Sequence, residues 1–330
     1  MVSLKYSQSI HEVRDCSVNI LEIVDCRCRN CYTGILHRSL FGNREKNGEN
    51  MLKQYIKLLR VKHYIKNLLI FVPLFFSGCL FDLQRFNRGL EGFFAFCLIS
   101  SAIYILNDYR DIEKDRKHPV KKNRPLASGK ISKCRGGVTL CVCVVAALGV
   151  CVHTRNIRAS ICLMIYFVLN IVYSMGLKNV PIIDVIILAS GFVLRVFFGG
   201  FITNIEISKW LYLVVTTGSL YMGLGKRRNE LKKQLDTRDV LKKYNFPFLD
   251  KNMYVCVAMA NVFYALWTIE MPDSRLVWTT PFFMVMLMCY SLDTEGDSDA
   301  DPVEVILHDK VLIAIIICYT ICILGILYIF

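Results

Sequence analysis

The 330-residue sequence has few charged residues for its length, and six long stretches have none. Charged residues make up 20% of the chain and hydrophobic residues 54%, whereas a typical soluble protein is about 25% charged. The charge-free stretches are residues 136–152, 159–177, 210–225, 252–269, 276–292 and 311–330. Each approaches the ~20 apolar residues that a helix needs to cross a ~30 Å hydrocarbon layer. This pattern excludes a soluble globular protein.

Three interrupted apolar runs, at about 64–84, 89–107 and 181–203, are also long enough to cross a membrane. Inside lipid the backbone must satisfy its own hydrogen bonds, so every crossing segment has to be a helix. The sequence therefore predicts an all-α, polytopic membrane protein with about nine transmembrane helices. No internal repeat divides the apolar runs, which indicates one transmembrane domain over residues 51–330.

Residues 1–50 lack any long apolar run and lack the pattern of a signal peptide. We expect them to form a polar extension that is loosely ordered, and translation starting at Met51 is an alternative that the sequence leaves open. Cys26-x-Cys28-x-x-Cys31 within this extension does not have the spacing of a common zinc site. From Met51 the chain begins a basic amphipathic pattern, typical of a helix at the membrane surface.

The net charge of +13 is concentrated in particular segments. Basic residues gather before residue 67, at about 110–135 and at about 226–251, whereas the connections at about 153–158, 204–209 and 270–275 are short and together carry a net charge of only +1. The positive-inside rule then places the N-terminus and both long basic loops in the cytoplasm of a multi-pass cell-membrane protein. The expected partners of this charge are anionic headgroups and substrate phosphates, and no nucleic acid is expected.

An acidic stripe closes one of the apolar runs. Asn107, Asp108, Asp111 and Asp115 fall within roughly 100° of one helical face. Carboxylates grouped in this way repel one another unless a cation lies between them, and hard oxygen ligands suit Mg²⁺ bound to substrate phosphates. The alternative is a solvated helix end whose acidic charges are neutralised by neighbouring basic side chains.

A basic loop follows directly. Lys121, Lys122 and Arg124 come after the carboxylates, and Pro119 and Pro125 stiffen the loop between them. A metal ion flanked by lysine and arginine side chains forms a suitable site for a diphosphate. The same charges would also serve to orient the protein in the membrane, and the two roles are compatible.

The pattern Asn107-Asp108-x-x-Asp111-x-x-x-Asp115, followed by Lys121-x-x-Arg124-Pro-x-Ala-x-Gly129, resembles the first motif of the UbiA superfamily of intramembrane prenyltransferases. The resemblance covers about residues 51–330. It implies a bundle of nine helices, a cytoplasmic-side cavity and Mg²⁺ as cofactor. It also implies that Asp108, Asp111 and Asp115 are catalytic and bind the metal, while Asn107, Lys121, Lys122 and Arg124 contact substrate.

The loop after the sixth expected helix departs from the aromatic-acceptor members of that family, which carry a DxxxD motif there. This loop contains Lys226, Arg227, Arg228 and Glu230, and such a basic cluster favours a substrate with more phosphate than a prenyl diphosphate. Several further segments resemble the decaprenyl-phosphate phosphoribosyltransferase branch. They contain Lys66-Asn67, Tyr173-Ser174, Leu177-Lys178, Asp184, Gly191-Phe192-x-Leu194-Arg195, Gly225-Lys-Arg-Arg-x-Glu230, Pro302-x-Glu304 and Leu307-x-Asp309.

The branch implies transfer of a phosphoribosyl group from phosphoribosyl pyrophosphate to a polyprenyl phosphate, with release of pyrophosphate. Asp184 is then a further catalytic candidate. The substrate-binding candidates are Lys66, Tyr173, Lys178, Arg195, Lys226, Arg227, Arg228 and Glu230. Lys66 and Lys178 are candidates for the lipid phosphate, with snorkelling to the membrane surface as the alternative.

Asp184, Gly191 and Arg195 share one face of an expected helix, at positions i, i+7 and i+11. An ionisable residue as deep in the membrane as Arg195 is expected to face the bundle interior. Its alternative role is pairing with backbone carbonyls or polar groups of a neighbouring helix. Asp184 has two open roles, as a ligand of the metal or ribose or as the cap of its helix.

Two other functions remain as hypotheses. The first is a prenyltransferase that moves a prenyl chain from its diphosphate donor to an aromatic or other small acceptor. The second is a transporter, which would ordinarily show paired repeats and broken helices near the bilayer midplane. The sequence shows neither feature, and its ionisable cluster lies at the expected cytoplasmic edge.

Overall fold

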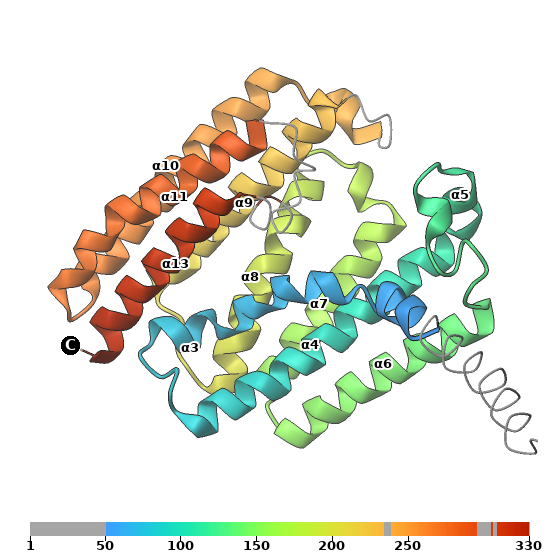
Figure 1. The fold of residues 1–330 in the computed structure, drawn as a ribbon, viewed down its shortest axis with the longest axis horizontal. Coiled ribbons are helices and arrows are strands. Elements are labelled where there is room, and N and C mark those ends of the chain that lie inside the picture. The colour runs from blue at the N-terminus through green and yellow to red at the C-terminus, as the bar shows by residue number, and fades with distance from the viewer. Residues whose placement is uncertain (1–50, 234–238, 296–304, 306–308, 330) are drawn as a thin grey trace, which may run out of the picture. The chain divides into compact units, whose positions relative to one another are not determined.

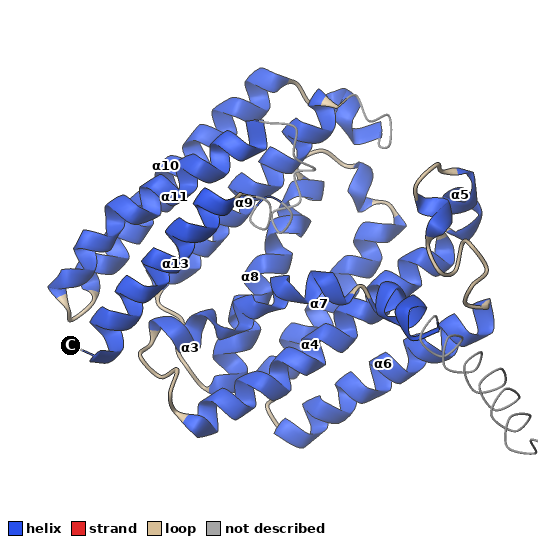
Figure 2. Cartoon of the chain, in the orientation of Figure 1, coloured by secondary structure: helices blue, strands red, loops and turns tan. Residues whose placement is uncertain are grey.

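The computed structural model describes residues 51–233, 239–295, 305 and 309–329. These residues form helices and short connections, and none of them lies in a strand (Figure 2). The chain divides into two compact units, Met1–Tyr55 and Ile56–Phe330, and the second contains every element discussed below. The all-α class that the sequence predicts is confirmed.

Within the described residues, eight helices of 15 or more residues make up the bundle (Figure 1). They are α4 (Leu83–Arg110), α6 (Lys133–Thr154), α7 (Ile157–Met175), α8 (Ile183–Thr203), α9 (Lys209–Lys232), α10 (Phe246–Glu270), α11 (Thr280–Glu295) and α13 (Lys310–Leu324). Shorter elements connect them: η1 (Val61–Phe71), α3 (Val72–Phe76), α5 (Ile112–Lys117), η2 (Lys121–Asn123), η3 (Leu177–Asn179), η4 (Asp239–Lys243), η5 (Ser274–Thr279) and the π-helical turn η6 (Gly325–Ile329).

Seven segments of the described chain are long and apolar enough to cross a membrane. They comprise α4, α6, α7, α8, α10, Ser274–Thr294 and Lys310–Ile329. The expected count of nine is not confirmed. The apolar run at 64–84 is not one helix, because η1 and α3 end at Phe76 and the chain turns through Gly78, at a positive φ of 73°. Helix α9 is not among these seven segments, and its last turns carry charged residues, beginning at Lys226.

Polar N-caps begin six of the long helices. In each, the capping side chain accepts a hydrogen bond from a backbone N–H in the first turn, which satisfies a donor that the helix cannot pair internally. The capping residues are Asp82, Ser132, Asn156, Ser208, Asn245 and Asp309. These caps mark where each apolar segment starts.

The basic amphipathic pattern at Met51 does not continue as one helix. Residues 51–59 are helical, and Arg60 then adopts the left-handed conformation with φ 53° before η1 begins. This break separates the helical start from the apolar segment that packs into the bundle.

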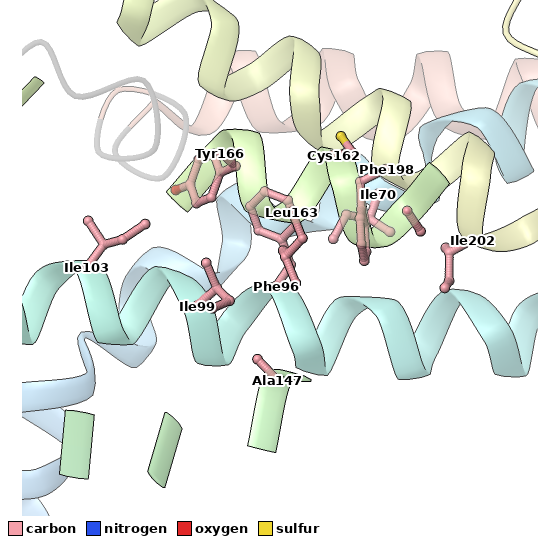
Figure 3. Packing of buried hydrophobic residues seen from close by; sticks show 11 residues of the cluster. Ile70, Phe96, Ile99, Ile103, Ala147, Cys162, Leu163, Tyr166, Phe198 and Ile202 are labelled. Carbon is pink, nitrogen blue, oxygen red and sulfur yellow. The ribbon is translucent and has the colours of Figure 1, made fainter. Parts of the chain in front are cut away.

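Helices α4 and α8 are central, whereas α6 lies at the periphery. In the most apolar window of each helix, 61% of the α4 residues and 50% of the α8 residues are buried, against 17% in α6. Side chains from η1, α4, α6, α7 and α8 form a common core around Phe96 and Phe198 (Figure 3). Gly199 of α8 lets that helix approach η1 closely, because a Cβ there would lie 2.0 Å from the carbonyl oxygen of Ile70.

A second group of buried residues joins α8, α9, α10 and α13. Tyr221 and Leu224 of α9 pack with Leu249 and Met253 of α10 in this group. The two cores meet along α8, so this helix positions side chains from both halves of the bundle.

Candidate functional site

Two buried carboxylates, Asp108 at the C-terminal end of α4 and Asp115 in α5, share one guanidinium. Asp108 and Asp115 are each 3% exposed. Nη1 of Arg124 donates to Asp108 Oδ1 at 3.0 Å and to Asp115 Oδ2 at 2.7 Å. The basic loop that begins at Lys121 therefore folds back onto the acidic stripe, and the structure brings together three predicted site residues.

Arg60 completes this acidic cluster, which we define as Asp108, Asp115, Arg124 and Arg60. Its Nη2 donates to Asp108 Oδ1 at 2.6 Å, and its guanidinium lies 4.6 Å from the ring centroid of Tyr104. Sequence reasoning missed Arg60, because it is one of several basic residues in the segment before residue 67. Only a contact across 48 positions of chain distinguishes it from its neighbours.

Asp111 is placed differently from the other two aspartates. It caps the end of α4 and the start of α5, and its side chain forms no hydrogen bond or ion pair with any residue that the structure describes. Asn107, one turn earlier, accepts a hydrogen bond at 2.7 Å from the hydroxyl of Ser174 on α7. Asp111 thus offers its carboxylate to a ligand, while the amide of Asn107 is tied to α7.

A second group of charges, the Arg227 cluster, consists of Asp184, Arg227, Glu230, Tyr173 and Tyr244. Nε of Arg227 donates to Asp184 at 2.5 Å, Nη1 donates to Glu230 at 2.6 Å, and Nη2 donates to the Tyr173 hydroxyl at 3.2 Å. Arg227 and Asp184 are both fully buried. Four residues predicted from the sequence therefore meet here, drawn from α7, α8 and α9.

Tyr244, just after η4, is a member that sequence reasoning did not find. Its hydroxyl donates to the second oxygen of Asp184 at 2.6 Å and accepts from the backbone N–H of Ile182 at 2.6 Å. Burial, together with the hydrogen bond donated to Asp184, raises the pKa of Tyr244 to about 12. Asp184 is not a helix cap, since Ile182 occupies the cap position of α8 and no side chain caps it.

The end of α7 joins the two clusters. Ser174 contacts Asn107 of the acidic stripe, and its neighbour Tyr173 contacts Arg227. Because these two residues are adjacent, both clusters lie beside the last turn of α7. The structure thus collects Asp and Arg side chains from four segments distant in sequence at one end of the bundle.

Arg195 faces the bundle interior, as the sequence predicts, and is 6% exposed. Its three nitrogens donate to Asn67 Oδ1 at 2.8 Å, to the backbone oxygen of Gly191 at 2.6 Å and to the Tyr166 hydroxyl at 2.9 Å. All of these acceptors are neutral, and within the described chain no carboxylate forms an ion pair with Arg195. Arg195 therefore ties η1 and α7 to α8, which matches the pairing alternative.

The other predicted basic residues are spread over the same end of the bundle. Arg228 turns away from Arg227 and donates to Asp250 of α10 at 2.5 Å. Lys66, Lys121 and Lys226 are half-buried and each interacts with neighbouring groups. Lys178 is half-buried in η3, and Lys122 is exposed in η2. Lys226, Arg227 and Arg228 thus do not act as one surface patch.

The carboxylate oxygens of Asp108, Asp111 and Asp115 are the kind of ligand that a hard divalent cation prefers. In this structure Asp108 and Asp115 are paired with arginines. No three His, Cys, Asp or Glu side chains are grouped closely enough to hold a metal ion in residues 51–233, 239–295 and 309–329. Arg60 and Arg124 supply the positive charge that Asp108 and Asp115 require, so the buried carboxylates form a place for cations. Asp111 adds oxygen atoms of the kind that Mg²⁺ prefers.

The membrane-length helices, with buried and paired charges gathered at one end, are those of a multi-pass membrane protein. The family model described as "UbiA prenyltransferase family" matches residues 71–237, and the chain belongs to this family. It is therefore a UbiA-type transferase.

Comparisons with individual proteins agree with this assignment. The chain is 32% identical over 296 residues to the decaprenyl-phosphate phosphoribosyltransferase of Corynebacterium glutamicum, covering 85% of this chain and 89% of the relative. It is 31% identical over 284 residues to the enzyme of the same name from Mycolicibacterium smegmatis, covering 80% and 89%. The solved structure of a UbiA homolog from Archaeoglobus fulgidus bound to GPP and Mg²⁺ matches the fold with a TM-score of 0.61 and 18% identity, covering 82% of this chain and 99% of that one.

Proposed function

We propose that this chain transfers a phosphoribosyl group from phosphoribosyl pyrophosphate to a polyprenyl phosphate, with release of pyrophosphate. The observation that carries the proposal is that the last turn of α7 contacts both Asn107, the neighbour of Asp108 in the acidic cluster, and Arg227 of the second cluster. One cluster supplies carboxylates for a cation and the other a buried guanidinium. Relatives named decaprenyl-phosphate phosphoribosyltransferase support the choice of substrates.

Asp108, Asp111 and Asp115 are the residues that would hold Mg²⁺, whose charge would neutralise the pyrophosphate leaving group. Arg60 and Arg124 now donate to the carboxylates, at 2.6 to 3.0 Å. Guanidinium groups donate equally well to phosphate oxygens, so these arginines would turn their hydrogen bonds to the diphosphate when the carboxylates bind metal. Lys121 and Lys122 extend the same positive surface.

The chemical step needs little beyond this charge stabilisation. The bond between the anomeric carbon and the pyrophosphate oxygen breaks, and a phosphate oxygen of the lipid forms the new bond to that carbon. The nucleophile is already an anion, so no strong general base is required. Lys66 and Lys178 are the residues proposed to bind the lipid phosphate. Both are half-buried, Lys66 within η1 and Lys178 in η3 directly after α7.

The Arg227 cluster favours phosphoribosyl transfer over the aromatic-acceptor alternative. In place of a second DxxxD motif, the end of α9 carries Arg227. Its guanidinium donates to Asp184, Glu230 and Tyr173, and the hydroxyl of Tyr244 donates to Asp184. We propose that this cluster fixes the wall against which the ribose phosphate binds, with Glu230 and Tyr173 at its less buried edge.

The test uses membranes containing the full chain, radiolabelled phosphoribosyl pyrophosphate and polyprenyl phosphate. The proposal expects label in the lipid phase, and no label with the Asp111→Asn variant. Label that enters lipid only when a prenyl diphosphate and an aromatic acid replace these substrates would establish the alternative prenyltransferase and overturn the proposal.

We also propose that the acidic cluster faces the cytoplasm, because the long basic loops lie at that end of the bundle. Cys134 is exposed at the start of α6, directly after the basic loop. A membrane-impermeant thiol reagent is expected to label Cys134 in inverted vesicles and not in intact cells. A Cys134→Ser variant identifies the signal, and labelling from outside intact cells would reverse the orientation.

A further inference from the structure

A polar hollow of about 630 Å³ lies at the opposite end of α4 from the acidic cluster. Its walls are the first turns of α4, the connection from α6 to α7 and the last turn of α8. Arg88 in the hollow and Asp108 are 20 positions apart on one helix, which corresponds to roughly 30 Å at 1.5 Å per residue. That separation equals the thickness of the hydrocarbon layer, so the hollow lies at the other membrane face.

Three exposed arginines surround the hollow: Arg88, Arg155 and Arg158. The side chains of Arg155 and Arg158 form no hydrogen bond or ion pair with any residue in the described part of the chain. The one carboxylate in the lining, Glu91, lies 4.0 Å from His153, which would neutralise it when protonated. The hollow therefore presents a positive charge that the protein leaves uncompensated.

The rim that carries these arginines is held in place. Asn156 caps α7, and its amide nitrogen donates to the backbone oxygen of Phe201 at the end of α8 at 2.5 Å. Arg155 and Asn204 each end a helix in the left-handed conformation, with φ 50° and 53°. The start of α7 adds partial positive charge, and the ends of α6 and α8 add partial negative charge. The arginines therefore determine the sign of the electrostatic potential in the hollow.

Apolar side chains continue from the hollow along the outer surface of the bundle. Val152, Ile157 and Ile161 are 76%, 74% and 55% exposed on α6 and α7. A ligand that joins an anionic headgroup to hydrocarbon chains would match both surfaces at once. Arginines at this face also depart from the positive-inside pattern of the rest of the chain, so orientation in the membrane does not account for them.

We propose that this hollow binds the phosphate headgroup of an anionic phospholipid in the leaflet away from the acidic cluster, with the acyl chains lying against the apolar surface of α6 and α7. The site is separate from the transferase site and does not depend on the proposed function. Guanidinium groups at a membrane surface bind phosphates through charge-assisted hydrogen bonds, which explains why arginine serves here.

The test measures lipid binding to the purified full chain by native mass spectrometry, with phosphatidylglycerol and phosphatidylcholine of identical acyl chains. The test variant combines Arg155→Asn, since asparagine tolerates the left-handed conformation, with Arg158→Gln. The matched control is Arg275→Gln in the connection from α10 to α11, where the arginine is already paired with Asp273 at 2.6 Å. Thermal unfolding in phosphatidylcholine alone verifies that each variant folds.

We expect the double variant to bind phosphatidylglycerol about 25-fold more weakly, from about fivefold per arginine, with phosphatidylcholine binding and the control unchanged. Equal affinity of the double variant and the parent for phosphatidylglycerol would overturn the proposal. Displacement of the lipid by soluble glycerol phosphate at matched concentration would also overturn it, because the site would then recognise the anion alone.

Discussion

Arg227 and Asp184 form a fully buried ion pair in which Nε of the arginine donates to Oδ2 of the aspartate at 2.5 Å. The two residues lie on α9 and α8, 43 positions apart, and the other two nitrogens of Arg227 donate to Glu230 and Tyr173. This pair therefore holds the wall of the site in one conformation, and it gives the first prediction.

Asp184→Asn is expected to lower the free energy of unfolding by about 3–5 kcal/mol, because the buried guanidinium of Arg227 loses the fully buried one of its two carboxylate partners. Arg228→Gln provides the comparison one residue away from Arg227. Its pair with Asp250 is partly exposed, at 20% and 28%, so the expected loss is about 0–1 kcal/mol. Thermal unfolding in detergent measures both, and equal losses would show that the Arg227 pair is not specially buried.

Asp111→Asn is expected to reduce transfer by about 10²–10³-fold while leaving thermal unfolding unchanged. The reason is that the Asp111 side chain has no partner among the described residues, so its loss affects a bound ligand more than the fold. Glu113→Gln, an exposed neighbour that pairs with Arg116 at 3.0 Å, serves as the matched control. Near-normal magnesium-dependent activity of Asp111→Asn would remove the metal-binding role.

Tyr244 gives a prediction about alkaline pH. Its pKa in the folded chain is raised to about 12 from 10.0, mainly by burial. Because the folded chain holds the hydroxyl proton of Tyr244 more tightly than the unfolded chain does, this group contributes its full stabilisation below pH 10. The contribution disappears as the pH rises through about 12. The stability difference between the parent and Tyr244→Phe should therefore shrink over this range, whereas Tyr109→Phe, at an exposed position, should show no such trend. A constant difference would contradict the contact with Asp184.

Gly199→Ala is expected to destabilise the bundle by about 1–3 kcal/mol, toward the upper end, since the added Cβ would meet the backbone of Ile70. Gly218→Ala on α9 is the matched change, because no atom lies within 4 Å of a Cβ there. It is expected to be neutral or to stabilise by up to about 1 kcal/mol. The two substitutions are compared by thermal unfolding, and a similar effect of both would argue against close packing of α8 on η1.

The helices were predictable because lipid imposes one rule on every crossing segment. The charge-free run 252–269 lies within α10, and all but the last two residues of the run 159–177 lie within α7, with a polar cap before each helix. The run at 64–84 is not one continuous helix, since η1 and α3 end at Phe76, and average hydropathy does not reveal the turn at Gly78. Local composition therefore finds long helices and misses short broken ones.

The candidate site was predictable where its residues share a motif and not where they meet across the fold. The sequence expects Asp108 and Asp115 on one helical face with Arg124 close behind them, and the structure brings all three together although the helix breaks at Asp111. Arg60 and Tyr244 instead reach their aspartates across 48 and 60 positions, and nothing nearby in the sequence sets them apart from other basic or aromatic residues. Arg227 and Arg228 likewise have different partners because they point in different directions from α9. Which of the two points inward depends on how α9 packs in the bundle, and the sequence alone does not show this.

The positively charged guanidinium of Arg195 lies inside the bundle and donates hydrogen bonds only to neutral groups. Its electrostatic potential is therefore not cancelled locally and extends along α8 toward Asp184, about 17 Å away by helix rise. At an effective dielectric constant near 20, a unit negative charge at that distance is stabilised by about 1 kcal/mol. An anionic group at this end of α8, Asp184 included, is thus stabilised by a charge with which it makes no contact.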